Sequence, residues 1–447
     1  MSARQSNEGP TPGWQAIHAR LLALHPKRID LSLGRIERIL AALDHPERRL
    51  PPLIHVAGTN GKGSTIAFMR AILEAAQKRV HVYTSPNLVR LNERFRIGQT
   101  SGGSYVKDDE LAAVLAECEA RNGDAPITVF EIETAAAFLL FTRHQADIVL
   151  LEVGLGGRLD ATNMIERPLA SVITRVSLDH REFLGDTLEQ VAAEKAGILK
   201  HGVPAVVSSQ AAAVLAVIER QASRVQAPLS IAGQDWTATE ERGRLVYQDA
   251  DGLFDLPAPK LYGRHQFENA GAAIAALRAS GVKLPAAAFE AGMVRVDWPA
   301  RMQRLSHGQL TALLAAESEL WLDGGHNADG GRAIAAALAD LEERVSRPLV
   351  LIVGMMSSKD SEGFLRNFAG LARRVIAVPI RQEKALPAET LAETARGIGI
   401  AAMACDDIER ALDVARKLDF EPAPRVLITG SLYLAGEVLA ANGTPPE

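Results

Sequence analysis

The sequence has few features that would anchor it in a membrane or cross-link it. Its 447 residues include only two cysteines, Cys118 and Cys405, which lie far apart and outside any CxxC pattern. This scarcity indicates a reducing, cytoplasmic environment. No uninterrupted apolar run approaches the roughly 18 residues of a membrane-spanning helix, and the first ten residues contain no apolar core of a signal peptide. We therefore expect neither secretion nor a membrane span.

Long runs of one charge are also missing. The net charge of −5 comes from 49 basic and 54 acidic residues, so neither a nucleic acid nor a membrane surface is favoured as a partner. With 47% hydrophobic and 23% charged residues, the chain has an ordinary globular composition. Its length is too great for one hydrophobic core and predicts two or three domains.

A nucleotide-binding loop is the strongest local pattern. A strand-like run at residues 53–56 leads into GTNGKGS at 58–64 and then into a helical stretch. In such a junction the glycines and Asn60 bring backbone N–H groups onto phosphate oxygens, Lys62 binds the outer phosphates and the Ser64 hydroxyl binds magnesium. Gly63 makes it a variant of the usual pattern, and a turn that only serves packing is the alternative. Because strand, loop, lysine, hydroxyl and helix occur in the required order, we predict ATP binding.

Short apolar runs alternate with helical patterns along most of the chain, which is typical of parallel α/β layers. A first series of strands is expected at residues 53–56, 80–83, 148–151, 171–174 and 204–207. Residues 226–259 suggest a small β excursion, and residues 267–277 a return to helix. After a proline-containing segment at 296–302, a second series is expected at residues 320–322, 349–353, 375–378 and 426–428.

These patterns predict an α/β protein with two domains. Residues 1–296 would form an N-terminal P-loop domain with a mostly parallel sheet, and residues 297–447 a smaller, Rossmann-like α/β domain.

Polar side chains follow three strands of the first series. Ser85 follows the second strand, Glu152 ends the third, and His180 lies just beyond the fourth. The carboxyl ends of parallel strands share one edge, where ligands of such sheets bind. A buried carboxylate needs a cation or a donor, so Glu152, Ser85 and Ser64 form a candidate magnesium site. The alternatives are an ion pair of Glu152 with Arg158 or a neighbour, and a simple Ser-Pro turn at Ser85.

Lys195 interrupts the apolar stripe of the helical stretch at residues 187–200. Desolvation there favours the neutral amine, which can react with CO₂ to give a carbamate and so become an oxygen ligand. With Glu152 and His180 it would then hold a second cation. The residues alone favour the alternative, a lysine whose head reaches water beside Glu194.

Nine motifs in one order carry a resemblance that spans residues 28–439. They are GTNGKGS, YTSPNLVRLNERF, LLEVGLGGRLDATN, SLDHREFLG, EKAGI, GRHQFENA, PARMQRL, DGGHNADG and ITGSLYLAGEVL. Such a collinear series is specific, although any one member would be weak. The series resembles folylpolyglutamate synthase/dihydrofolate synthase of the Mur ligase superfamily.

The resemblance implies a full set of site residues. Lys195 would be a carboxylated lysine, and Ser64, Ser85, Glu152 and His180 would serve two magnesium ions. The loop residues Asn60, Gly61, Lys62, Gly63 and Ser64, with Asn269, Arg301 and Asp323, would hold ATP, and His326 would lie near the nucleotide. Lys62, Lys195, His180 and His326 would be the catalytic residues. The pterin-binding segments would be Arg28, Ile29, Asp30 and Leu31, then Thr128, Val129, Phe130 and Glu131, then Leu159, Asp160 and Ala161.

The implied reaction begins with attack of a substrate carboxylate on the γ-phosphate, which gives an acyl phosphate and ADP. The amine of L-glutamate then displaces phosphate to form an amide. The carboxylate substrate would be dihydropteroate or a reduced folate, and Lys62, the cations and Arg301 would offset the repulsion between anions. The linker would be the hinge of domain closure, and we expect a monomer. The sequence leaves open whether a monovalent cation assists.

Three positions depart from the family pattern: Asn87 and Gly325 replace the usual histidine and alanine, and Arg181 replaces threonine and would add positive charge near His180.

Three other functions remain open: a P-loop NTPase or kinase, a non-catalytic nucleotide-binding module, and a cell-wall Mur ligase that acts on a UDP-linked substrate. The motif LEVGLGGRLDATN and the segment at residues 29–31 favour the folate branch.

Overall fold

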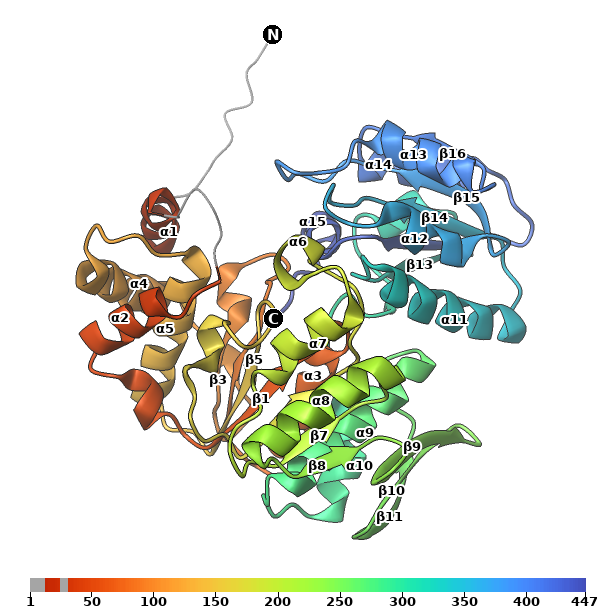
Figure 1. The fold of residues 1–447 in the computed structure, drawn as a ribbon. Helices are drawn as coiled ribbons and strands as arrows, with labels where there is room; N and C mark the ends of the chain where they lie inside the picture. The colour runs from red at the N-terminus through yellow and green to blue at the C-terminus, as the bar shows by residue number, and fades with distance from the viewer. Residues whose placement is uncertain (1–12, 25–30) are drawn as a thin grey trace.

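The computed structural model describes residues 13–24 and 31–447, which form two α/β parts, each built on its own sheet (Figure 1). The first sheet has the strand order β4-β3-β2-β5-β1-β6-β7-β8. Strands β1, β2 and β5 to β8 are parallel, whereas β3 and β4 run antiparallel at one edge. The strands are β1 (Leu53–Ala57), β2 (Val80–Tyr83), β3 (Phe95–Ile97), β4 (Ser104–Tyr105), β5 (Ile148–Glu152), β6 (Ala170–Ile173), β7 (Ala205–Val207) and β8 (Leu229–Ile231).

Helices cover both faces of this sheet, which is why its central strands are buried throughout and mostly apolar. One face packs against α3 (Lys62–Ala75), α9 (Arg264–Ala279) and α10 (Ala286–Arg295). The other face is covered over β2 and β5 by α1 (Gly13–Ala23), α2 (Gly34–Ala42), α4 (Asp108–Asn122) and α5 (Val129–Arg143). Over β6 and β7 it is covered by α7 (Leu188–Ala196) and α8 (Ala212–Val225). The short α6 (Arg181–Leu184) lies beyond β6.

The predicted β excursion is an antiparallel sheet of three strands, β9 (Trp236–Glu241), β10 (Arg244–Asp249) and β11 (Gly252–Pro257). It packs against α9 and α10 through Trp236, Leu245, Tyr247 and Leu256. Residues 229–231, which the sequence assigned to the excursion, instead form β8 at the edge of the first sheet.

The second sheet has the order β12-β13-β17-β14-β15-β16, and β12 is its antiparallel edge. Its strands are β12 (Gln303–Leu305), β13 (Glu319–Leu322), β14 (Leu349–Val353), β15 (Ala372–Ala377), β16 (Ala402–Ala404) and β17 (Arg425–Thr429). One face packs against α14 (Ile408–Arg416) and α15 (Leu432–Asn442). The other packs against α11 (Ala328–Arg344), α12 (Ser361–Leu365) and α13 (Ala388–Gly397). The predicted α/β class, with a larger P-loop sheet and a smaller Rossmann-like one, is thus confirmed.

The hydrophobic clusters divide close to the predicted linker. Val296 belongs to the core of the first sheet, and Trp298 packs against it, whereas Ala300 belongs to the core of the second. Two segments cross this division: Leu88 and Val89, from the loop after β2, and Tyr262, just before α9, pack against the cores of the second sheet. The division at residues 296 and 297 remains our proposal. In the described part of the chain, no helix is both long enough and apolar enough to cross a membrane.

Candidate functional site

The predicted nucleotide loop follows β1 directly and is held by close backbone packing. Gly58 has φ +152°, and a Cβ atom there would lie 1.9 Å from Thr174 Oγ1 on the neighbouring segment. Gly61, with φ +91°, precedes α3, whose first residue is Lys62. Lys62 Nζ donates to the carbonyl oxygens of Gly58 (3.2 Å) and Thr59 (3.3 Å). The amine therefore points back over the loop, where it can exchange neutral carbonyl partners for phosphate oxygens.

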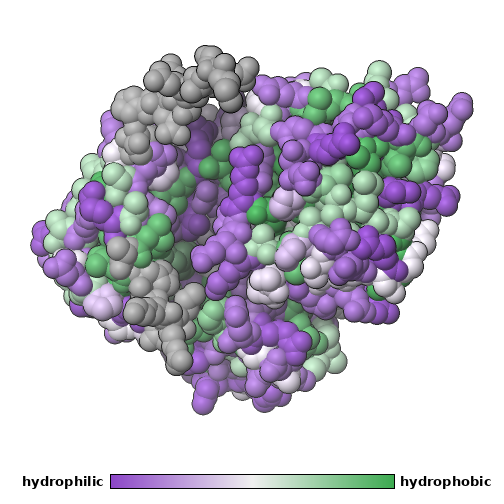
Figure 2. Space-filling view, turned by 90° about the horizontal axis from the view of Figure 1, so that it is seen from above, coloured by the Kyte–Doolittle hydropathy of each residue, from purple (hydrophilic) through white to green (hydrophobic). Residues whose placement is uncertain are grey.

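All the residues that the sequence assigned to nucleotide or metal line one cavity of about 190 Å³. They come from both parts of the chain, so the cavity lies between the carboxyl edges of the two sheets. Seen from above, the surface is hollowed between its left-hand lobe and the rest, and both hydrophilic and hydrophobic side chains line the hollow (Figure 2). The lining residues are Asn60, Gly61, Lys62, Gly63, Ser64, Ser85, Glu152, His180, Lys195, Asn269, Arg301, Asp323 and His326.

Glu152 is a buried carboxylate at the end of β5, and burial raises its pKa. The positive charge of Lys62 opposes that rise, with Lys62 Nζ 3.9 Å from Glu152 Oε1. The backbone N–H of Ser85 donates to Glu152 Oε2 at 3.2 Å. Of the ion pairs considered as alternatives, the one with Arg158 does not form, because Arg158 instead contacts Glu194 at 2.7 Å, whereas the neighbouring Lys62 does pair with Glu152. The carboxyl group of Glu152 therefore lies where a divalent cation could take its oxygens as ligands.

Lys195 is also buried, with 5% of its surface exposed, so its head does not reach water beside Glu194. Its Nζ donates to the carbonyl oxygen of Gly58 at 2.9 Å, directly beneath the nucleotide loop. Burial, and then the charge of Lys62, lower the pKa of Lys195 to about 7. A large share of the amine is therefore neutral at neutral pH, which is the state that carboxylation requires.

These donors fit magnesium better than they fit a transition metal. In the described ranges, no group of three or more His, Cys, Asp and Glu side chains could by itself hold a metal ion. Magnesium is usually bound by one or two carboxylates together with phosphates and waters. Ser64, Ser85 and Glu152 could supply oxygen ligands to one such ion. A second ion beside Glu152 and His180 would need Lys195 in carboxylated form, because a free amine is not a magnesium ligand.

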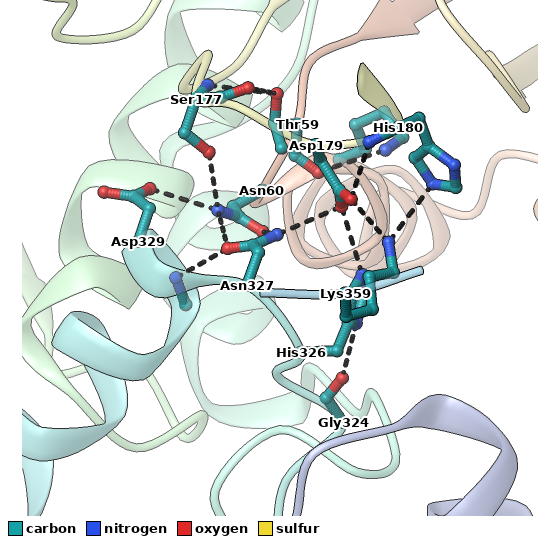
Figure 3. A network of polar contacts seen from close by, with 12 residues as sticks. Thr59, Asn60, Ser177, Asp179, His180, Gly324, His326, Asn327, Asp329 and Lys359 are labelled. Atoms are coloured by element: carbon teal, nitrogen blue, oxygen red, sulfur yellow. Dashed lines mark hydrogen bonds and ion pairs between the residues drawn. The ribbon is translucent and has the colours of Figure 1, made fainter. Parts of the chain in front are cut away.

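A polar network joins the two domains above the nucleotide loop (Figure 3). The Asp179 carboxylate accepts from Lys359 Nζ (2.5 Å) and Asn327 Nδ2 (3.2 Å) and lies 3.3 Å from His326 Nε2. Burial alone would raise the pKa of Asp179, but its contacts with His326 and Lys359 hold that pKa well below its usual range. Burial and the charge of Lys359, 3.5 Å away, lower the pKa of His180 to about 4. His180 is therefore neutral at neutral pH, as a metal ligand must be.

The nucleotide loop itself takes part in this network through Asn60. The side-chain amides of Asn60 and Asn327 exchange two hydrogen bonds of 3.1 Å, and Asn60 also donates to Asp329 (3.1 Å). Asp329 in turn accepts from Arg175 at 2.9 Å. Because Asn327 caps α11 by accepting from the backbone N–H of Gly330, the start of that helix is fixed against the loop.

Arg301 and Asp323 lie where the linker enters the second sheet. Asp323 accepts from the backbone N–H groups of Met302 and Gly325, both at 2.7 Å. Arg301 lies between Ala300 and Met302, which both have positive φ, and donates to the Ala300 carbonyl at 2.8 Å. Asn269 donates to Gln266 at 3.0 Å on α9. The backbone of the linker thus presents a cation to the nucleotide cavity from the second domain.

A larger cavity of about 690 Å³ adjoins the first and shares Ser85, His180 and His326 with it. It is lined by the predicted pterin residues Leu31, Thr128, Val129, Phe130, Glu131, Leu159, Asp160 and Ala161. The predicted Arg28, Ile29 and Asp30 lie outside the described residues. Two of these lining residues also fix the start of α5: Thr128 and Glu131 form its capping box, and Glu131 pairs with Arg35 at 2.9 Å.

The sequence reasoning missed several side chains of the site, above all Lys359 and Asp329. Lys359 follows β14 at the carboxyl edge of the second sheet, and that position was its only signal in the sequence.

The departures from the family pattern have local partners. Asn87 accepts from Arg94 at 2.9 Å, and Arg181 pairs with Asp186 at 2.8 Å. The positive charge that lies beside His180 belongs to Lys359, whereas Arg181 is largely exposed.

A P-loop sheet that faces a smaller parallel sheet across a cavity with these side chains defines a Mur-type ligase. Residues 56–277 match the family described as "Mur ligase middle domain", and residues 301–432 match "Mur ligase, glutamate ligase domain". Within that class, the chain belongs to the dihydrofolate synthase/folylpolyglutamate synthase family.

Three known proteins illustrate the similarity. The chain is 33% identical over 417 residues to the Escherichia coli dihydrofolate synthase/folylpolyglutamate synthase, covering 93% of this chain and 92% of that protein. The structure of E. coli FolC with DHPP and ADP has a TM-score of 0.86 and 32% identity, covering 96% of this chain and 97% of the other. A bifunctional folylpolyglutamate synthase/dihydrofolate synthase with Mn, AMPPNP and L-glutamate bound has a TM-score of 0.83 and 32% identity, covering 98% and 99%.

Proposed function

We propose that this protein is an ATP-dependent ligase that joins L-glutamate to the carboxylate of dihydropteroate or a reduced folate and releases ADP and phosphate. One observation carries the proposal: the predicted nucleotide and metal residues line one cavity that opens, past Ser85, His180 and His326, onto a larger cavity lined by the predicted pterin segments. The relatives bind ADP and DHPP, or AMPPNP, Mn and L-glutamate, which supports both halves of this assignment.

The residues provide what the first step needs. A carboxylate that attacks a triphosphate brings two anions together, so cations must offset the repulsion. Lys62 and Arg301 reach the nucleotide cavity from opposite domains. Magnesium would be held by Ser64, Ser85 and Glu152, and by Glu152, His180 and Lys195, and when bound would neutralise phosphate charge.

The second step joins an amine to a water-labile acyl phosphate, so water must be excluded. Three contacts hold the two domains together over the loop. They join Asn60 to Asn327, Asp179 to Lys359, and Arg175 to Asp329. His326 lines both cavities and is held by the Gly324 carbonyl (2.9 Å) and Asp179 (3.3 Å). It therefore lies at the junction where the phosphate meets the substrate carboxylate.

Several finer assignments complete the proposal. The Lys195 amine would carry a carbamate, two magnesium ions would act together, and a monovalent cation would be an additional factor to test. We further propose that the protein acts as a cytoplasmic monomer on small-molecule substrates. The match to the family's bifunctional members supports both synthase activities. Light scattering coupled to gel filtration tests the oligomeric state.

One assay tests the function: ADP release measured with dihydropteroate, with tetrahydrofolate and with neither, each with and without L-glutamate. We expect ADP release that requires both a pterin substrate and glutamate. Steady ADP release without glutamate would instead indicate an NTPase or kinase. Turnover only with a UDP-linked substrate would indicate a cell-wall ligase.

A further inference from the structure

A single polar side chain lies inside the strand that carries the nucleotide loop. His55 is at the centre of β1, is fully buried, and is flanked by Leu53, Ile54, Val56 and Ala57. Burial, and then the charge of Lys200, lower the pKa of His55 to about 3, so the ring is neutral. A neutral imidazole in an apolar strand is costly unless its ring nitrogens are hydrogen-bonded.

One ring nitrogen begins a chain of hydrogen bonds. His55 Nε2 lies 2.9 Å from Thr162 Oγ1, which lies 2.5 Å from Asp160 Oδ1. The Asp160 carboxylate also accepts the backbone N–H groups of Thr162 (2.9 Å) and Leu155 (2.8 Å). The Thr162 hydroxyl has one proton, and it donates that proton to the carboxylate. Its oxygen must then accept from His55, so the ring is protonated at Nε2.

This series of hydrogen bonds ends in the wall of the larger cavity, which we assign to the pterin substrate. Gly154 and Leu155 line both cavities, whereas Leu159, Asp160 and Ala161 line the larger one. By accepting from Leu155 and Thr162, Asp160 closes residues 155–162 into a fixed loop. His55 therefore reaches the predicted pterin wall from within the strand that ends at the nucleotide loop.

We propose that His55 is a positioning residue for the pterin substrate, acting through Thr162 on the orientation of the Asp160 carboxylate. This inference rests on the proposed function for the identity of the substrate. A second buried histidine provides a contrast. His81, on β2, has partners at both ring nitrogens, the His144 carbonyl (3.1 Å) and the Gly98 N–H (2.9 Å), and stacks on Phe141. His55 instead has no hydrogen-bond partner for Nδ1 among the described residues. Its ring therefore makes fewer hydrogen bonds than the ring of His81, although both are buried.

The test uses calorimetric binding of dihydropteroate in the presence of AMPPNP, and of AMPPNP alone. The variants are His55→Leu, His55→Gln and Thr162→Val, with the double variant His55→Leu/Thr162→Val and the control His81→Leu. Glutamine can place an amide N–H near the position of Nε2, and valine replaces the hydroxyl of threonine with a methyl group of similar size. Thr162→Val also keeps the test valid if His55→Leu fails to fold.

We expect His55→Leu and Thr162→Val each to weaken dihydropteroate binding about tenfold, with AMPPNP binding unchanged. His55→Gln should bind nearly as the wild type, and the double variant should be no worse than either single one. His81→Leu should lower the melting temperature but leave both affinities intact. Equal loss of both ligands, unchanged dihydropteroate binding, or no recovery with glutamine would overturn the inference. Wild-type protein that binds no dihydropteroate would overturn the proposed function itself, and this inference with it.

Discussion

Lys62 begins α3 and donates to two carbonyl groups of its own loop. These contacts are not part of a hydrophobic core, so the Lys62→Ala substitution should leave the fold intact. We expect it to lower kcat by at least about a thousandfold, because the charge on the transferring phosphoryl group loses the side-chain cation of the nucleotide loop. ADP release measures the effect, and thermal unfolding checks the fold. Lys417→Ala, which alters an exposed lysine just after the end of α14, is the control; equal activity of the two variants would remove Lys62 from the mechanism.

Burial of the Lys195 amine predicts how the contribution of this group to stability depends on pH. Its folded pKa of about 7 lies below its usual value of 10.5, so between these values the unfolded chain binds the proton and the folded chain does not. The contribution of this group to stability therefore falls as the pH is lowered from 10.5 to about 7, and then levels off.

Carboxylation needs the neutral amine, so a carbamate should be abundant at about pH 8 and should decline by about pH 6. Carbon-13 NMR of protein equilibrated with labelled bicarbonate measures its signal directly. A carbamate signal independent of pH, or none at all, would contradict the assignment.

The Lys195→Ala substitution tests whether Lys195 acts as a carbamate or as a free amine. We expect loss of activity, because the second cation loses a ligand, and partial recovery with short-chain carboxylates that can enter the space left by the side chain. Activity assays across a series of such acids measure the recovery. Absence of recovery, together with an unmodified lysine in an intact-mass measurement of the wild type, would show that the amine acts in another way.

Sequence reasoning located some side chains of the site and missed others, for a physical reason. Glu152 and Lys195 stood out because each interrupts an apolar pattern, and the structure shows both to be buried beside the nucleotide loop. Lys359 lies among polar residues, and Asp329 lies between Ala328 and Gly330, so neither interrupts an apolar run. Their contacts with Asp179 and Arg175 join residues more than 150 positions apart, and only the packing of two domains brings them together.

The start of α11 has two separable tasks. Asn327 caps the helix, and it also exchanges hydrogen bonds with Asn60 of the nucleotide loop. Asp407 caps α14 in the same way but far from the site, which makes it a matched control. Asn327→Ala and Asp407→Ala should each cost about 1 kcal/mol of stability. Only Asn327→Ala should lower kcat, by about tenfold or more, because only it loosens the second domain from the loop. Equal kcat values in the two variants would show that the amide pair has no catalytic consequence.

The buried central strands were predicted well, and the edge strands were not. Runs such as residues 148–151 and 349–353 are apolar throughout because helices cover both faces of their sheets. β3, β4, β12 and β16 were missed, since each has only two or three residues and lies at or next to an edge, where little apolar surface is needed. β8 fell within the segment assigned to the excursion, because two of its three residues are only partly buried and the strand shows no distinct pattern.

The division of the hydrophobic clusters near residue 296 predicts that the two parts can fold separately. Fragments 1–296 and 297–447 should each show a cooperative thermal transition by circular dichroism, because each contains its own sheet and cores. Neither fragment should release ADP, since Lys62 and Glu152 would be separated from Arg301, Asp323 and His326. A fragment that is unfolded by itself would show that the boundary lies elsewhere or that the parts depend on each other.

The loop after β2 limits how the two parts could be exchanged between related enzymes. Leu88 and Val89 pack into the core of the second domain, and a Cβ atom on Gly436 of α15 would lie 2.0 Å from the Leu88 carbonyl oxygen. Arg90 donates to the Pro446 carbonyl at 2.8 Å in the same region. A chimera that took its glutamate-ligase half from a relative would therefore need residues 88–90 from that relative as well, even though they lie more than two hundred positions before the junction.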